Sequence, residues 1–389
     1  DFLEGFYLRD GQGFEEWATL QRERLRHLAR EGFRTLASHQ LKTGAYLEGT
    51  ATAARWRHLD PYSEEACRTF MWLHTRAGQP HLALQCYQHF KALLDVDVGV
   101  EPGANTTALF DQLRRLSFPP PLELPAPPAV FVGREAELAA VERLLAESDS
   151  RLLTLAGPGG IGKTRLAIEA ARSLAQRLPG RFLDGVFFIP LAALQSAESI
   201  PTQIADWARI PLQGAAPPGQ QVLAYLAGRE VLLLLDNVEH LLDAQGTAVN
   251  FLVGLLRQAP GVKLLLTSRE RLSLYEEVIF DVEGLATAQD DSELAPSSAA
   301  LLFVESARRV SRDFSPSAAD LGCIARACRL VEGTPLAIEL AASWLRHYSC
   351  PQIVQQIEQS LDFLASDYRD LPERQRSLRS VFEYSWRLL

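Results

Sequence analysis

Residues 157–164 read Gly-Pro-Gly-Gly-Ile-Gly-Lys-Thr, which fits the pattern G-x-x-x-x-G-K-T at every fixed position. The apolar run Leu152–Ala156 comes directly before this segment, and small and apolar residues at helical spacing follow it. A strand, a glycine-rich loop and a helix in this order are typical of a phosphate-binding loop. The glycines let backbone N–H groups surround a phosphate chain, and the helix dipole attracts the same anion. The sequence therefore predicts a nucleotide site.

Two positions near this loop predict how Mg²⁺ and the phosphates are held. Lys163 is expected to contact the β- and γ-phosphates, and the hydroxyl of Thr164 to bind Mg²⁺. The apolar run at residues 231–235 ends in Asp236, a carboxylate expected to bind the same ion. The predicted ligand is ATP or ADP with Mg²⁺. The residues expected to contact it around the loop are Gly157, Gly159, Gly160, Ile161, Gly162, Lys163, Thr164 and Arg165.

The position after Asp236 bears on the rate of hydrolysis. A hydrolysing enzyme of this kind generally has a second acid there, which orients the attacking water. This chain has Asn237, whose amide cannot accept a proton, and Glu239 lies two residues beyond the expected position. The sequence therefore predicts slow hydrolysis at best.

Arg269 follows the next apolar run, residues 263–267. A guanidinium at the carboxyl end of a strand beside a phosphate site can bind the γ-phosphate through two N–H groups. The alternative is a surface ion pair with Glu270 or Glu277. Together with Lys163 and Asp236, Arg269 is one of the predicted catalytic residues.

The pattern of apolar runs predicts the fold of the second part of the chain. Five β-rich runs alternate with helical segments, which favours an α/β domain with a mostly parallel sheet. From about residue 285 helical spacing takes over, and Thr334 can cap a helix that has Pro335 in its first position. The five runs are residues 152–156, 186–191, 231–235, 263–267 and 278–282.

The first part of the chain is helical in pattern, and a proline-rich segment at 119–128 separates it from the second. Prolines neither propagate a helix nor supply a sheet ladder, so this segment is interpreted as a linker. Equivalent residues 34 positions apart indicate a tetratricopeptide-like repeat of paired helices. The pairs are Gly44 and Gly78, Gly49 and Ala83, and Trp56 and Phe90.

Residues 22–36 carry two stripes at helical spacing. The apolar stripe is expected to face a core. The basic stripe could contact nucleic acid, but the interleaved Glu23 and Glu31 favour a solvated helix face. The apolar residues are Leu25, Leu28, Ala29, Gly32, Phe33 and Leu36, and the basic ones are Arg22, Arg26, Arg30 and Arg34.

Composition limits the class of protein. The 389 residues are 47% hydrophobic and 22% charged, which describes a globular protein of several domains, and no apolar run is long enough to cross a bilayer. A net charge of −9 argues against the chain as a whole being a nucleic-acid binder. Five cysteines without a C-x-x-C pair are typical of reduced thiols in a cytoplasm. Because the chain begins with Asp1, we expect it to be part of a longer protein.

Five motifs in the second part together resemble the STAND/NB-ARC family of signalling ATPases. They are residues 131–135, 157–164, 235–237, 267–269 and 333–337. The resemblance implies that Val132 and Arg134 lie near the base and ribose, that Pro335 packs on the adenine, and that Arg269 senses the γ-phosphate. Residues 370–386 resemble the start of this family's winged-helix domain, and the histidine that contacts ADP there is expected beyond residue 389.

The first part resembles the bacterial transcriptional activator domain of SARP-type regulators, through residues 1–8, 14–17, 22–25, 59–61 and 99–102. The resemblance implies a DNA-binding winged helix before residue 1, and hence promoter DNA as a partner of the whole protein. RNA polymerase and nucleotide-dependent self-assembly are further candidate partners, and no membrane is expected.

The predicted organisation is an all-α, tetratricopeptide-like domain followed by an α/β P-loop domain and a helical subdomain. The boundaries are 1–117 for the activator domain, 118–129 for the linker, 130–284 for the P-loop domain, 285–360 for the helical subdomain and 361–389 for the start of a winged helix. The expected function is a nucleotide-dependent switch in a bacterial transcriptional regulator. The alternatives are a STAND-type sensor or defence ATPase, and a fast ATPase or kinase.

Overall fold

A computed structural model describes residues 2–3, 5–6, 12–126, 131–147, 150–242, 245–288, 297–365, 377 and 379. Internal contacts divide the chain into two units. The helical unit comprises Asp1–Pro121, Ala146–Ser148 and Ala175–Gly185. The α/β unit comprises Leu122–Leu145, Asp149–Leu174 and Val186–Leu389.

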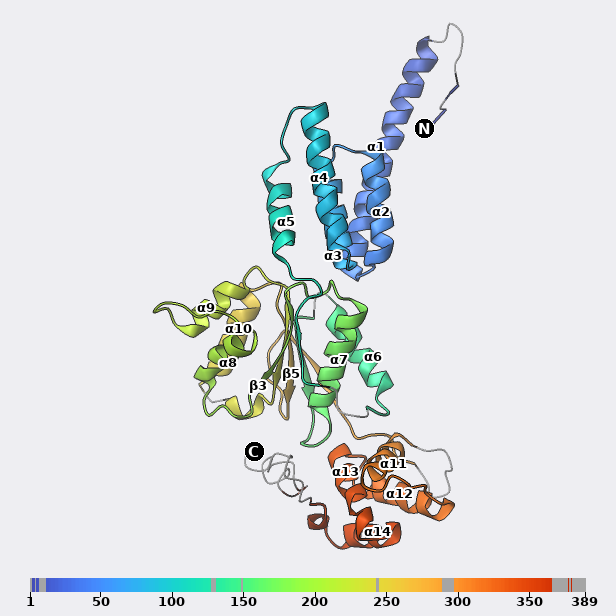
Figure 1. Ribbon diagram of the computed structural model, residues 1–389, viewed down its shortest axis with the longest axis vertical. Helices are drawn as coiled ribbons and strands as arrows, with labels where there is room; N and C mark the ends of the chain where they lie inside the picture. The colour runs from blue at the N-terminus through green and yellow to red at the C-terminus, as the bar shows by residue number, and fades with distance from the viewer. Residues whose placement is uncertain are drawn as a thin grey trace. The chain divides into compact units, whose positions relative to one another are not determined.

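The helical unit contains two successive helix pairs and a fifth helix (Figure 1). Gly44 and Gly78 have φ angles of 79° and 83° in the turns before the second helix of each pair. A Cβ on Gly49 would lie 2.4 Å from Cδ2 of Leu73, so a larger residue there would displace the Leu73 side chain at this helix crossing. The offset of 34 residues therefore corresponds to a repeated helix pair. The helices are α1 (Gln12–Thr43), α2 (Tyr46–Leu59), α3 (Glu64–Arg76), α4 (Pro80–Asp97) and α5 (Ala104–Arg115).

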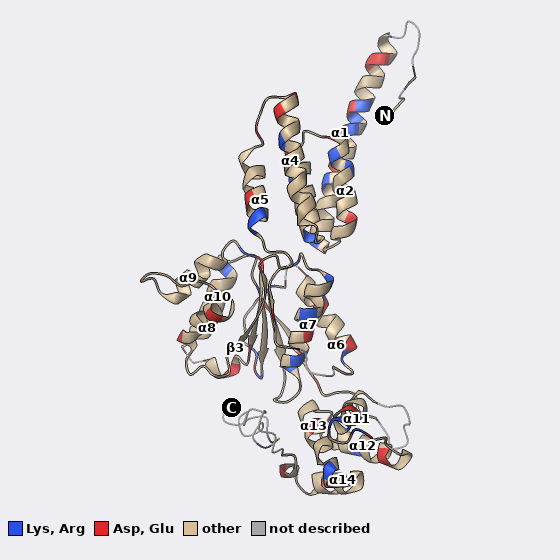
Figure 2. Cartoon of the chain, in the orientation of Figure 1, with Lys and Arg blue, Asp and Glu red and all other residues tan. Residues whose placement is uncertain are grey.

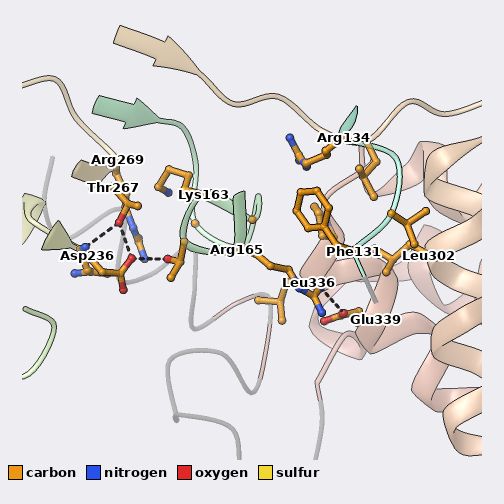
Figure 3. A pocket seen from close by; sticks show the side chains of 18 of the residues that line it. Phe131, Arg134, Lys163, Arg165, Asp236, Thr267, Arg269, Leu302, Leu336 and Glu339 are labelled. Atoms are coloured by element: carbon orange, nitrogen blue, oxygen red, sulfur yellow. Dashed lines mark hydrogen bonds and ion pairs between the residues drawn. The ribbon is translucent and has the colours of Figure 1, made fainter. Parts of the chain in front are cut away.

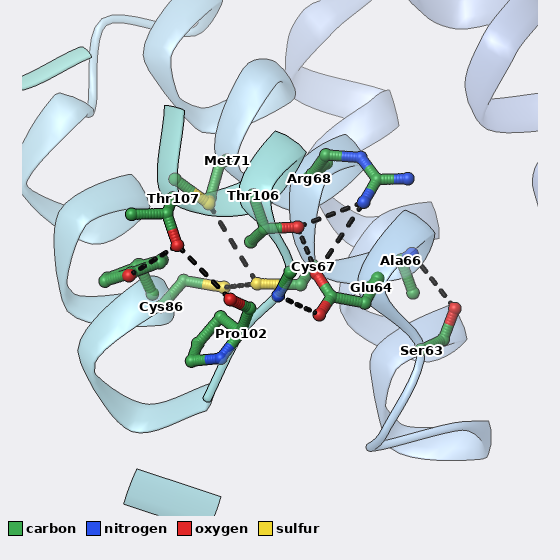
Figure 4. A network of polar contacts seen from close by, with 12 residues as sticks. Ser63, Glu64, Ala66, Cys67, Arg68, Met71, Cys86, Pro102, Thr106 and Thr107 are labelled. Carbon is green, nitrogen blue, oxygen red and sulfur yellow. Dashed lines mark hydrogen bonds and ion pairs between the residues drawn. The ribbon is translucent and has the colours of Figure 1, made fainter. Parts of the chain in front are cut away.

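A polar network attaches α5 to α3 (Figure 4). Gly103, the residue that precedes α5, donates its backbone N–H to Oε1 of Glu64 at 2.7 Å. The hydroxyl of Thr106 donates to the other carboxylate oxygen, and Arg68 donates to that hydroxyl at 3.0 Å. Glu64 therefore satisfies the exposed start of α5, where backbone N–H groups lack partners within the helix.

The expected apolar stripe of α1 is not a core face. Leu25, Leu28 and Leu36 are 45%, 57% and 47% exposed, so that expectation was wrong. For Leu25 and Leu28 the reason is length, because α1 has 32 residues and the neighbouring α2 only 14. Beside Leu36 the core face of α1 carries Ala37 instead, which is fully buried. Basic and acidic residues alternate along α1 (Figure 2), and Arg30 pairs with Asp60 at 3.1 Å. These features are those of a solvated face.

The α/β unit is built on a six-stranded sheet with the order β1-β3-β4-β5-β2-β6. Strands β1 and β3, β2 and β5, β2 and β6, and β4 and β5 pair in parallel. All five predicted strands are present, each within one residue of its expected bounds. The strands are β1 (Leu122–Glu123), β2 (Leu152–Ala156), β3 (Gly185–Pro190), β4 (Val231–Asp236), β5 (Lys263–Ser268) and β6 (Glu277–Asp281).

Strand β1 lies inside the segment interpreted as a linker without a ladder, so that part of the interpretation was wrong. Leu122 and Glu123 pair with Val186 and Phe187 of β3. Neither residue is a proline, and a two-residue strand at the edge of the sheet needs few backbone donors.

Helices cover both faces of the sheet, as predicted (Figure 1). Every residue of β2, β4 and β5 is buried, which explains their leucine-rich runs. On one face lie α8 (Ile200–Trp207), α9 (Pro218–Leu226) and α10 (Thr247–Gln258), and on the other α6 (Glu135–Ala146) and α7 (Lys163–Arg177). Two short 3-10 helices, η1 (Ala197–Ser199) and η2 (Glu239–Leu241), follow β3 and β4.

A helical subdomain with its own apolar core follows β6, as predicted. Its elements are α11 (Ser298–Val310), α12 (Ala318–Leu330), α13 (Pro335–Ser343), η3 (Trp344–Arg346), α14 (Cys350–Gln359) and η4 (Leu361–Phe363). The predicted winged-helix start at 370–386 lies outside the described residues, apart from residues 377 and 379. None of the described helices is long and apolar enough to cross a membrane.

Candidate nucleotide-binding site

The glycine-rich segment forms the loop between β2 and α7, and α7 begins at Lys163. Gly157, Gly160 and Gly162 have φ angles of 151°, 78° and 97°, which residues with a side chain rarely adopt. A Cβ on Gly157 would lie 2.7 Å from the carbonyl oxygen of Val282. The loop therefore needs glycine for its backbone path as well as for access by a phosphate.

Lys163 lies over the loop, where its Nζ donates to the carbonyl oxygens of Gly157 and Pro158 at 2.8 and 3.0 Å. Burial lowers the pKa of this ammonium to about 8, and the negative charges of Glu239 and Asp236 oppose that shift. A partly buried ammonium that donates to two neutral carbonyl groups favours an anionic ligand.

Three elements bring oxygen ligands together at the carboxyl end of β4. Oδ1 of Asp236 accepts from the hydroxyl of Thr164 at 2.5 Å and from the hydroxyl of Thr267 at 2.7 Å (Figure 3). A carboxylate and a hydroxyl suit Mg²⁺, which completes its shell with waters and phosphate oxygens. Thr164 and Asp236 therefore fit the predicted magnesium site, and bound Mg²⁺ would neutralise phosphate charge there.

Asn237 has a φ of 67°, a left-handed conformation that asparagine tolerates better than most residues. Its backbone N–H donates to the hydroxyl of Thr267 at 2.9 Å. Its side-chain amide lies 3.2 Å from Nδ1 of His240, whose Nε2 lies 3.2 Å from the carbonyl oxygen of Leu194. With Nε2 donating to Leu194, Nδ1 accepts from the amide, so His240 orients Asn237.

Arg269 has a buried carboxylate as its partner, because its Nε lies 3.1 Å from Oε1 of Glu239. The two side chains are 13% and 2% exposed. Glu277, one of the surface partners considered above, accepts backbone N–H groups of Leu272 and Leu274 instead. The structure thus brings Arg269 to the pocket that contains Lys163 and Asp236.

The opposite end of this pocket is apolar (Figure 3). Val132 and Pro335, which the family resemblance placed near the base, are both among the residues that line the pocket, and their contact with a base stays a prediction. Three further apolar residues there, Phe131, Leu302 and Leu336, were not among the predicted site residues. Phe131 and Leu336 could have been predicted, because they are adjacent in sequence to the predicted residues Val132 and Pro335. Leu302 could not, because only the tertiary fold brings it to the pocket.

Arg134 is 3% exposed and braces the loop. Its Nη2 donates to the carbonyl oxygens of Ile161 and Glu283, both at 2.8 Å, and its Nη1 lies 3.5 Å from Glu137. The guanidinium therefore joins the phosphate loop to the segment after β6. Arg134 also lines the pocket, and its contact with a base or ribose stays a prediction.

The helical subdomain reaches the phosphate loop directly. The backbone N–H of Leu336 donates to the carbonyl oxygen of Gly160 at 3.3 Å. Arg165, the residue after Thr164, forms an ion pair with Glu339 of α13 at 3.1 Å. The pocket is therefore shared between the α/β core and the helical subdomain, as Figure 3 shows.

The fold and the site define a P-loop nucleotide-binding protein. Residues 1–114 match the bacterial transcriptional activator domain, and residues 130–266 match the AAA ATPase domain. The chain thus joins a bacterial transcriptional activator domain to a P-loop ATPase domain, the arrangement of a SARP-type regulator fused to such an ATPase.

Relatives cover different shares of the chain. An uncharacterized protein of Mycobacterium tuberculosis is 33% identical over 67% of this chain and 62% of its own length. The regulatory protein AfsR of Streptomyces griseus is 27% identical over 85% of this chain and 34% of its own length. The chain therefore spans less than two thirds of these relatives. A solved STAND protein with a tetratricopeptide repeat sensor, from Pyrococcus horikoshii, is 17% identical over 60% of this chain and 33% of its own, with a TM-score of 0.38.

Proposed function

We propose that this chain is the ATP- and ADP-dependent switch module of a bacterial transcriptional regulator. The observation that carries the proposal is one pocket that joins Lys163, Thr164, Asp236 and Arg269 to residues of the helical subdomain. A nucleotide in that pocket would contact both the α/β core and the subdomain that follows it. The activator domain at residues 1–114 is the part whose activity the switch would change.

The contacts between the two parts of the pocket explain how a phosphate could act as a signal. Leu336 and Glu339 lie in the first turns of α13, and they contact the phosphate loop at Gly160 and Arg165. A ligand shifts an equilibrium between two arrangements by the difference in its affinity for each. ATP and ADP differ by the γ-phosphate, so they would favour different positions of the helical subdomain.

The rate of hydrolysis tests the switch against a fast enzyme. Because Asn237 occupies the position of the expected acid and is oriented by His240, we expect multiple turnover well below the roughly 1–100 s⁻¹ of kinases. Asn237→Asp should leave nucleotide binding intact and raise hydrolysis, since it supplies a carboxylate at that position. Phosphate release at saturating ATP is the measurement.

The matched control is Asn250→Asp, which adds the same charge at an exposed position of α10 outside the pocket. It should leave the rate unchanged. Turnover of the unmutated chain within the range of kinases would contradict the switch and favour a fast ATPase or kinase. A STAND-type sensor or defence ATPase is the remaining alternative, and the activator-domain match favours the regulator over it.

Promoter DNA is a proposed partner of the whole protein, through a domain outside this chain. RNA polymerase and further copies of the protein are candidate partners in the same proposal, and the cytoplasm is the proposed location. An element that reads DNA sequence must present side chains to base edges. The chain has a net charge of −9, and two arginines of the basic stripe of α1, Arg30 and Arg34, pair with carboxylates, so this stripe is a poor candidate for such an element.

We therefore expect residues 1–389 not to bind their own promoter region specifically. Residual binding through the arginines of α1 should be weak and steeply salt-dependent, since it depends on phosphate contacts. A gel-shift assay at physiological salt with competitor DNA measures this, with an unrelated duplex of equal length as the control. A discrete, competitor-resistant band would mean that the activator domain itself reads DNA.

A further inference from the structure

Glu239 has a place in the pocket that its sequence position did not indicate. It is the first residue of η2, directly after the turn that follows Asp236, and its side chain is 2% exposed. It lines the same pocket as Lys163 and Arg269. The two-residue displacement from the expected acid position therefore does not turn this carboxylate away from the site.

Only one oxygen of this carboxylate has a partner in the described part of the chain. Oε1 lies 3.1 Å from Nε of Arg269, whereas Oε2 is buried and has no hydrogen-bond partner there. A buried acceptor without a partner costs roughly 1–3 kcal/mol, and more when it carries a charge. A pair that served only stability would use both oxygens, because a guanidinium has five N–H donors and can bind a carboxylate through two of them.

Glu239 lines the pocket together with Arg269, to which its Oε1 is paired. Lys163, Asp236 and Thr164 line this same pocket. Lys163 is the group expected at the β- and γ-phosphates. Asn237, the other candidate for orienting water, has its amide directed to His240.

We propose that Glu239 is the residue that orients and deprotonates the water that hydrolyses ATP in this pocket. This inference rests on the proposed nucleotide site and deepens it. Oε2 accepts a proton from the water, whose oxygen forms a bond to the γ-phosphorus. The bond from that phosphorus to the bridging oxygen breaks, and its electron pair leaves with ADP. Arg269 keeps Glu239 in place through Nε.

This role accounts for slow rather than absent hydrolysis. The chain has a carboxylate for this role, Glu239, but it lies in η2 and not directly after Asp236. It is also paired with Arg269, which is the expected partner of the γ-phosphate. A guanidinium can serve both groups at once through different N–H donors. The attacking water must therefore bind between the carboxylate of Glu239 and the γ-phosphate while Arg269 contacts both groups, which makes hydrolysis slow.

Glu239→Gln tests the proposal, because glutamine has the same size and can still accept from Arg269 but cannot take up a proton. Single-turnover hydrolysis of radiolabelled ATP, followed for hours with enzyme in excess, should slow by about 10²–10⁴-fold, the usual contribution of a general base. The affinities for ATP and ADP, measured by calorimetry, should stay within about twofold. The control Glu305→Gln removes a carboxylate from a surface pair with Arg308 and should change neither quantity.

The outcomes separate this inference from the nucleotide site. A slowed reaction with unchanged affinities supports it, and an unchanged rate overturns it. A weaker ATP affinity with an unchanged rate at saturation also overturns it, because Glu239 would then only position Arg269. Hydrolysis by the unmutated chain no faster than in buffer would refute the inference while leaving nucleotide binding intact. Failure of the unmutated chain to bind either nucleotide would refute the proposed function itself.

Discussion

Lys163→Ala should remove most of the thermal stabilisation that ADP or ATP with Mg²⁺ gives to the unmutated chain. A ligand at 100 times its dissociation constant stabilises the folded state by about 2.7 kcal/mol. For a unit as large as the α/β unit, this gain in the free energy of unfolding corresponds to a rise in Tm of roughly 5–10 °C. The ammonium of Lys163 is the partly buried cation of the phosphate loop, so its loss removes the principal charge that a phosphate chain is expected to contact.

The variant itself should fold, which makes the experiment interpretable. Burial lowers the pKa of Lys163 to about 8, so the folded protein holds this charge at a cost when no anion accompanies it. Lys91→Ala is the matched control, since Lys91 is an exposed lysine of α4 that pairs with Glu101 at 2.9 Å. It should keep the full nucleotide-dependent shift. If the unmutated chain shows no shift with either nucleotide, the site assignment is wrong.

The parts of the fold that could be predicted from the sequence are those that local pattern determines. Strands such as β4 are buried on both faces, so nearly every position is apolar and the run stands out. The phosphate loop is equally local, because its glycines, lysine and threonine act within eight consecutive residues. The repeat of helix pairs was visible for the same reason, since Gly44 and Gly78 are required by turn geometry.

The features that the sequence did not indicate depend on partners that are distant in sequence. The apolar stripe of α1 has the period of a core helix, but whether Leu28 is buried depends on the length of its neighbours. The ion pair of Arg269 with Glu239 was not indicated by the sequence, because Glu239 comes from the loop after another strand, whereas the contact of Arg269 with a γ-phosphate stays a prediction. Glu339 reaches Arg165 across 174 positions of sequence, which no local pattern indicates.

Substitution of Arg269 should weaken the binding of ATP much more than the binding of ADP, and the choice of substitution depends on the ion pair of Arg269 with Glu239. A residue that contacts only the γ-phosphate contributes to ATP affinity and hardly to ADP affinity, because ADP offers it no partner. Arg269→Ala would also leave the buried carboxylate of Glu239 without its cation, and breaking a buried pair typically costs about 3–5 kcal/mol. Loss of folding could therefore obscure the binding result.

Arg269→Lys avoids this difficulty, because it keeps a positive charge for Glu239 but loses the planar fork that binds phosphate through two N–H groups. We expect its affinity for a non-hydrolysable ATP analogue to fall by roughly 10–100-fold, the equivalent of about 1.5–3 kcal/mol for a hydrogen bond to a charged group. Its affinity for ADP should change by less than about threefold. Calorimetric titration with both nucleotides measures the two values.

The control for this comparison is Arg271→Lys, two residues further along the chain. Arg271 is 60% exposed in its side chain and pairs with Asp281 at 3.3 Å, and it does not line the pocket. Its substitution should leave both affinities unchanged. Equal losses of ATP and ADP affinity in Arg269→Lys would mean that Arg269 contacts phosphates in general or only supports the fold. A loss confined to the ATP analogue would make Arg269 the residue that distinguishes the two states of the proposed switch.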